Sequence, residues 1–149
     1  MNFLVFLAAS AALAAYDVNE VQLGATEARV KERFPHVNCR PLEWRSQAAD
    51  RRCDDSRIQF GGIDAGVTFY LRKDSLQGFD VRFHTGDWQR VAQHLRERLG
   101  APLLDAGPKG PLEWKDDAGR ARLSADHEGR RATLSVWRGD FDERLYRIP

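Results

Sequence analysis

The feature that most constrains the fold is a two-residue alternation of apolar and polar side chains, which recurs on both sides of one helical stretch. The alternating segments are 58–60, 67–71, 79–83, 112–114, 123–125 and 134–136. Successive side chains of a strand point to opposite faces of the sheet, so such segments bury one face and expose the other. Turn residues separate most of them. The pattern therefore predicts about six half-buried antiparallel strands.

Between the two groups of strands, residues 85–102 have the pattern of an amphipathic helix. The apolar side chains of this stretch recur at helical spacing, and they are Trp88, Val91, Ala92, Leu95 and Leu99. Thr85 is a candidate N-terminal cap, and Gly100 followed by Pro102 indicates the end of the helix. We expect this helix to lie across the sheet and to supply the opposite half of the core.

A second, shorter helix is predicted near the start of the chain. Thr26 can cap it, Glu27 favours the positive end of the helix dipole, and Pro35 stops it near Phe34. Residues 21–84 and 85–138 then share one plan, a helix followed by about three antiparallel strands. The predicted fold is therefore α+β, with two helices on one face of a sheet of about six strands.

The N-terminal segment has the features of a signal peptide. Residues 1–15 carry no charged side chain, the apolar run 3–14 is too short to span a membrane, and residues 12–14 match a small-x-small cleavage pattern. We expect cleavage after residue 14, a single domain over 15–149, and no insertion into the membrane after cleavage. The predicted location is the periplasm or the extracellular medium.

Charge gives no reason to expect a nucleic-acid or membrane-surface partner. The 23 basic and 22 acidic residues are interspersed and give a formal net charge of +1. A weak cluster of arginines at 45, 51, 52 and 57 is interpreted as a solvated loop. No cofactor is predicted.

Cys39 and Cys53 are the only cysteines, and in an exported protein such a pair predicts a disulfide. Closing a loop of this length contributes roughly 3 kcal/mol in the chain-entropy model. The alternatives are a metal site that adds His36, or a redox-active pair. The metal site lacks a recognisable zinc spacing, and reactive dithiols usually lie two residues apart. No metal is therefore predicted.

The early part of the chain resembles a repeat of the beta-lactamase-inhibitor-protein-like fold. The motif is Val21-x-Leu23-Gly24-x-Thr26, followed by Val30 and the cysteines at 39 and 53. That fold is shared loosely with small outer-membrane assembly lipoproteins of the SmpA/OmlA type. The resemblance implies an exported bacterial module that binds other proteins through its sheet or loops. The chain departs from the pattern because it has no second cysteine pair and no lipobox.

The sequence contains no phosphate-binding glycine loop, no Gly-x-Ser-x-Gly elbow and no His-Glu-x-x-His motif. Three of the four histidines, at 36, 94 and 127, are expected in solvent. His84 shares a polar strand face with Asp80 and Arg82, so a general base at His84 is conceivable, although no nucleophile is placed beside it. No catalytic residue is predicted.

Strand alternation places Tyr70 and Trp137 on the polar face together with Arg82 and His84. Aromatic residues, arginine and histidine on an otherwise polar face are typical of a protein-binding surface. These four residues are the predicted binding site. Two alternatives remain open: the tail 141–148 could cover both rings, or a one-residue register shift could move them inside.

Two functions follow from these patterns. The favoured one is a non-catalytic interaction module that inhibits or regulates another envelope protein or assists envelope assembly, with Tyr70 and Trp137 exposed. The alternative is a small periplasmic hydrolase or ligand-binding protein with a pocket in which His84 has a hydrogen-bond partner.

Overall fold

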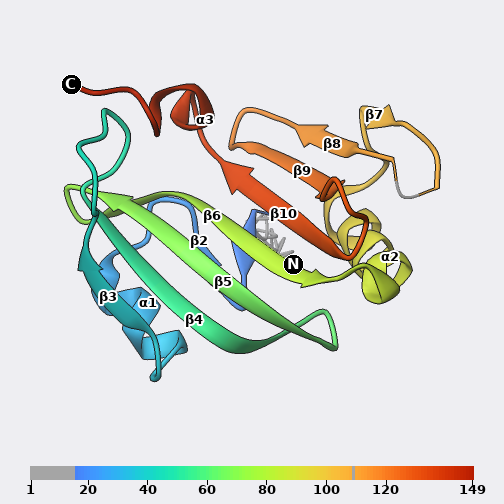
Figure 1. Ribbon diagram of the computed structural model, residues 1–149, viewed down its shortest axis with the longest axis horizontal. Coiled ribbons are helices and arrows are strands. Elements are labelled where there is room, and N and C mark those ends of the chain that lie inside the picture. The colour runs from blue at the N-terminus through green and yellow to red at the C-terminus, as the bar shows by residue number, and fades with distance from the viewer. Residues whose placement is uncertain (1–15, 109) are drawn as a thin grey trace, which may run out of the picture.

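A computed structural model describes residues 16–108 and 110–149. The predicted signal peptide, residues 1–14, lies outside the described residues. Eight antiparallel strands form one sheet in the order β3-β4-β5-β6-β10-β9-β8-β7 (Figure 1). Their bounds are Asn38–Pro41 (β3), Arg51–Phe60 (β4), Ile63–Arg72 (β5), Ser75–His84 (β6), Leu104–Asp105 (β7), Leu112–Lys115 (β8), Arg120–Ala125 (β9) and Arg131–Trp137 (β10).

The predicted α+β class with about six strands is wrong, because the protein is mostly β. The described part of the chain is only about 20% helical, and a two-stranded sheet, β1 (Asp17–Val18) with β2 (Val21–Gln22), adds to the eight-stranded one. The sequence pattern missed the two edge strands. β3 has four residues and ends in proline and β7 has only two, so neither is long enough to show an alternation.

The first helix, α1, spans Glu27–Arg33. The Thr26 side chain accepts a hydrogen bond from the backbone N–H of Arg29 at 3.2 Å, as expected of an N-cap. Val30 is fully buried, and Phe34 packs on Phe69 of β5 with ring centroids 5.3 Å apart. The helix is therefore held by packing of its apolar side against the sheet.

The second helix begins differently from the prediction. A 3₁₀ turn, η1 (Thr85–Asp87), precedes α2 (Trp88–Leu99), and the capping side chain belongs to His84 rather than Thr85. The Thr85 hydroxyl is buried and donates to the backbone carbonyls of Gly129 and Arg130 at 2.7 and 3.1 Å. Thr85 thus ties the start of the helix to the β9–β10 turn. Gly100 ends the helix with a φ of 82°, as the sequence indicated.

Both helices pack against one face of the sheet, which we call the inner face. A single apolar cluster joins the two helices to every strand from β4 to β10 except the edge strand β7, and it includes Val18 and Val21 of the small hairpin. Figure 1 shows α1 beside β3 and β4, and α2 near the β7–β9 side of the sheet. On the opposite, outer face, the only helix among the described residues is the four-residue α3.

The C-terminal tail crosses part of the outer face. After β10 it forms the short helix α3 (Phe141–Arg144) and then runs beside the β3–β4 loop (Figure 1). The Gln47 backbone N–H donates to the Arg147 carbonyl at 2.9 Å, and the Trp44 indole N–H donates to the Leu145 carbonyl at 2.9 Å. A small second apolar cluster joins the tail to the sheet and to the β3–β4 loop. It includes Leu145 of the tail, Tyr70 of β5 and Ala48 of the loop. Among the described helices, none has the length and apolar character that a membrane span requires.

Candidate functional site

A hollow of about 750 Å³ lies on the outer face where the tail does not reach. Its charged lining is Arg57, Arg82, His84, Arg131 and one acid, Asp64. We call this feature the arginine hollow. Two of the four predicted binding residues, Arg82 and His84, line it.

Strand pairing explains how residues far apart in sequence meet there. β6 and β10 pair with His84 opposite Arg131, and β5 and β6 pair with Gly66 opposite Arg82. Directly opposed residues share a face of the sheet. Arg57 enters from β4, where the register with β5 shifts between Asp55 and Ile58.

The hollow carries an excess of positive charge. Within the part of the chain that the structure describes, none of its three arginines forms an ion pair. The one acid in the lining, Asp64, accepts a hydrogen bond from the Gln59 side chain instead. Guanidinium groups with unused donors are suited to bind carboxylate or phosphate oxygens.

A chain of hydrogen bonds holds Arg82 in place. Its guanidinium donates to the Thr68 hydroxyl at 3.0 Å, Thr68 donates to the Asp54 carboxylate at 2.6 Å, and Arg52 donates twice to the same carboxylate at 2.9 Å. Burial pushes the pKa of Asp54 upward, but the hydrogen bonds from Arg52 and Thr68 outweigh it and hold the pKa below its usual value. Asp54 is therefore ionised and already satisfied, which leaves the remaining donors of Arg82 for the hollow.

His84 has a hydrogen-bond partner, but the partner is backbone. Its Nδ1 accepts from the Gly86 backbone N–H at 3.0 Å. We infer that the neutral ring carries its proton on Nε2, because Nδ1 already uses its lone pair. This ring can donate a hydrogen bond to a ligand, but it has no free lone pair with which to act as a general base.

Tyr70 and Trp137, the other two predicted binding residues, are not at the surface. They are 7% and 9% exposed, and the tail covers Tyr70. Phe141 of α3 packs against Tyr70 with the rings tilted and their centroids 5.6 Å apart, and Leu145 is buried in the same cluster. The expectation of an exposed aromatic patch is therefore wrong, and for Tyr70 the tail-covered alternative describes the structure. Burial raises the pKa of the Tyr70 hydroxyl to about 12.

Asp80 lies between the arginine hollow and the covered rings. Its carboxylate accepts a hydrogen bond from Ser135 at 2.7 Å. Burial raises the pKa of Asp80, whereas the Ser135 hydrogen bond and the charge of Arg82 oppose that rise. A partly buried acid at this position separates the two parts of the outer face.

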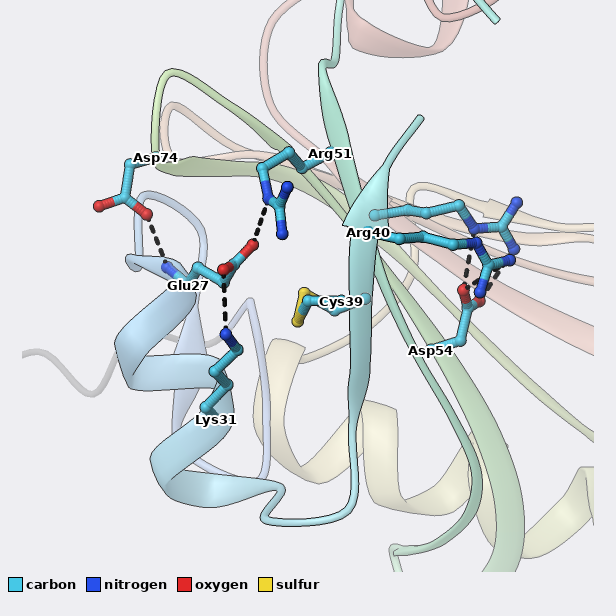
Figure 2. Close-up of a disulfide and its surroundings, with 9 residues drawn as sticks. Glu27, Lys31, Cys39, Arg40, Arg51, Asp54 and Asp74 are labelled. Carbon is cyan, nitrogen blue, oxygen red and sulfur yellow. Dashed lines mark hydrogen bonds and ion pairs between the residues drawn. A yellow bond between two sulfur atoms is a disulfide. The ribbon is translucent and has the colours of Figure 1, made fainter. Parts of the chain in front are cut away.

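The disulfide lies at the edge of the sheet, away from the hollow. Cys39 of β3 and Cys53 of β4 are directly opposed in the sheet and are bonded to each other, which confirms the predicted pair. Figure 2 shows Glu27 near Cys39, with ion pairs from Glu27 to Arg51 and Lys31. Glu27 and the two sulfurs lie close enough to suggest a metal site. Disulfide sulfurs are not thiolate ligands, so this cluster does not fit a metal ion.

His94 also departs from its predicted place in solvent. Its ring packs edge-on against Phe60 with centroids 5.1 Å apart, and burial lowers its pKa. The position is on the inner side of the molecule and contributes to packing.

Sequence reasoning missed two residues of the hollow, Arg57 and Arg131. The charge pattern alone grouped Arg57 with Arg45, Arg51 and Arg52 in a solvated loop, and that prediction is wrong because Arg57 belongs to β4. Arg131 begins β10, 47 positions after His84 ends β6, and only the register of the two strands brings it to His84.

Comparison with protein-family models, with curated proteins and with solved structures gave no match.

Proposed function

We propose that this protein is an exported, non-catalytic interaction module that binds an acidic segment of another envelope protein in the arginine hollow. The observation that carries the proposal is the set of three arginines around one hollow, none of which forms an ion pair within the described ranges 16–108 and 110–149. Arginine is enriched at protein-binding surfaces because its guanidinium group binds carboxylates with two parallel hydrogen bonds. His84 adds a donor at the same place.

The shape of the hollow favours a segment of protein over a small ligand. Most of its lining is exposed side chains, among them Ser56, Arg57, Gln59 and Arg131. Sites for small molecules usually bury most of the ligand and have a largely apolar lining. An open, charged hollow across strands β4, β5, β6 and β10 instead suits an acidic loop or strand that contacts several arginines at once.

The exported location is part of the proposal. The Cys39–Cys53 disulfide is compatible with an oxidising compartment. The apolar N-terminal segment and the resemblance to exported binding modules support the periplasm or the medium. The alternative function, a hydrolase that uses His84 as its base, is weakened because the Nδ1 of that ring is already hydrogen-bonded to Gly86.

Photo-crosslinking in the native cell envelope tests the proposal. A probe at Ser56 lies in the hollow without replacing a charged residue, and a probe at Arg90 on α2 is the control. We expect a discrete adduct from position 56 that is lost at high salt and in the Arg57→Gln/Arg131→Gln variant, and no such adduct from position 90. An adduct from position 56 that persists in the charge variant would contradict the proposal.

A further inference from the structure

Phe141 occupies a site on the outer face where a glycine, Gly78, lies between two aromatic residues, Tyr70 and Trp137. We call this site the Gly78 socket. Gly78 of β6 lies directly opposite Tyr70 of β5 and Trp137 of β10 in the sheet. A Cβ atom on Gly78 would lie 2.7 Å from Cε1 of Phe141, which is closer than real contacts. The ring therefore occupies space that any larger side chain at position 78 would take.

The start of the segment that carries Phe141 is poorly capped, whereas residues 145–148 are tied to the β3–β4 loop by hydrogen bonds from Trp44 and Gln47. α3 has only four residues and no side-chain hydrogen bond at its N-cap, and Gly139 just before it has a φ of 58° with no atom near the place of a Cβ. Beyond α3, Tyr146 and Ile148 are 74% and 71% exposed. Short, exposed C-terminal segments open more easily than core strands.

Trp137, the residue of β10 opposite Gly78, carries a polar group without a partner among the described residues. The indole N–H of Trp137 is buried, and among the described residues it has no hydrogen-bond acceptor. Buried donors without acceptors are rare in folded proteins because they lose their bond to water and gain none in return. A different occupant could bring a carbonyl or carboxylate oxygen to this N–H, which the tail does not.

We propose that the Gly78 socket is a second binding site, that it takes an aromatic side chain of a partner protein, and that Phe141 occupies it until the partner displaces the tail. The site lies on the same strand as the arginine hollow. From Gly78 to His84 is six residues along β6, or about 20 Å at the rise of a strand. If the arginine hollow binds as proposed above, the partner segment carries acidic residues and, about six residues away when extended, an aromatic residue.

Peptide binding tests this inference. The probe is an oligoglutamate peptide with phenylalanine about six residues beyond the last glutamate, and the matched probe has alanine at that place. In the Phe141→Ala variant we expect the phenylalanine peptide to bind about tenfold more tightly than the alanine peptide. In Ile148→Ala, which removes an exposed side chain from the same tail, the preference for phenylalanine should be no more than about twofold, as in the unaltered chain, where the peptide must compete with Phe141.

Two further variants make the result specific. Adding Gly78→Ala to Phe141→Ala places a methyl group in the socket and should remove the preference for phenylalanine. In the otherwise unaltered chain, a fluorine label on Phe141 should shift towards its solvent-exposed resonance when the phenylalanine peptide binds. This second measurement needs no destabilising substitution.

The outcomes separate this inference from the proposed function. If Phe141→Ala binds both peptides equally and the label does not move, the socket is not a binding site, whatever the arginine hollow does. If oligoglutamate does not bind at all, the proposed function fails, and N-acetylphenylalanine amide then tests the socket alone. It should bind Phe141→Ala and not Phe141→Ala/Gly78→Ala, and the absence of a difference would overturn the inference.

Discussion

The outer face of the sheet has two parts that share the strands β5, β6 and β10 and differ in what lies over them. In the covered part, Phe141 packs on Gly78 and the two aromatic rings are buried. In the arginine hollow, Gly66 has no atom closer than 3.6 Å to the place of a Cβ, and the charged side chains reach solvent. The same strands thus supply a packed surface at one end and an open, positively charged surface at the other.

Segments outside a strand therefore decide whether its outward-facing side chains are exposed. Tyr70 and Arg82 both point to the outer face by alternation, yet only Tyr70 has the tail above it. We expect substitutions in the covered part to change folding stability, and substitutions in the hollow to change binding.

The largest effect on stability is expected at Leu145. The side chain is 6% exposed and packs in the cluster beneath the tail. Leu145→Ala should lower the free energy of unfolding by about 2 kcal/mol, at the low end for buried leucines because the site is at the edge of the molecule. Urea unfolding measures it. Arg131→Ala, in the hollow, is the comparison and should change stability by less than about 0.5 kcal/mol; equal effects would break the distinction between the two parts.

The two glycines provide a matched pair of substitutions. Gly78→Ala forces a methyl group against Phe141 at 2.7 Å and should cost about 1–2 kcal/mol through overpacking, because the short tail can shift to relieve part of the clash. Gly66→Ala makes only ordinary contacts, so it should leave stability unchanged or raise it slightly, because alanine loses less backbone entropy than glycine. Thermal unfolding of both variants measures the contrast. A Gly78→Ala protein as stable as the unaltered chain would show that the tail does not lie where we describe it.

His84 is expected to contribute to stability as a cap. Its Nδ1 accepts the Gly86 N–H, so His84→Ala should lower the free energy of unfolding by about 1 kcal/mol, while His84→Asn keeps an acceptor and should recover most of that loss. Denaturant unfolding of the two variants distinguishes this role from one in ligand binding. No difference between alanine and asparagine would argue against the cap.

The smallest effect is expected at Asp80, on the border between the two parts. Its pKa is raised in the folded protein, mainly by burial. Between the unfolded pKa and this raised pKa, the folded state therefore holds a proton that the unfolded state has lost. Stability should therefore fall as the pH rises from the unfolded pKa of aspartate, about 3.9, through the raised folded value. Asp80→Asn keeps an acceptor for Ser135 and should remove this fall.

Unfolding of the aspartate and asparagine proteins across that pH range gives the test. If Asp80→Asn is less stable than the unaltered chain at neutral pH, the attraction between Asp80 and Arg82 outweighs the cost of burial. The covered part and the hollow would then be coupled through that pair.

The sequence predicted the central strands and the helices well, because long strands with one buried face leave a clear alternation. Phe69, Val81 and Leu134 are buried on the inner face as their positions indicated. The edge strands could not be found, since two to four residues carry no period. Their omission, and the weight given to the helices, produced the wrong fold class.

Of the four basic residues in the arginine hollow, the sequence predicted Arg82 and His84 but not Arg57 and Arg131. Alternation placed Arg82 and His84 correctly on the polar face, but it could not tell which part of that face the tail covers. That depends on long-range contacts of Phe141 and Leu145, for which a ten-residue tail gives no local signal. Arg57 and Arg131 could be found only from the pairing of β4 with β5 and of β6 with β10.

We propose that the arginine hollow binds an acidic partner. Amide chemical-shift mapping with an oligoglutamate peptide measures this binding residue by residue. We expect shifts to concentrate at Arg57, Arg82, His84 and Arg131 and to disappear at high salt, with no shift at Arg90 on α2. Shifts spread evenly over exposed arginines, or centred on α2, would contradict the account.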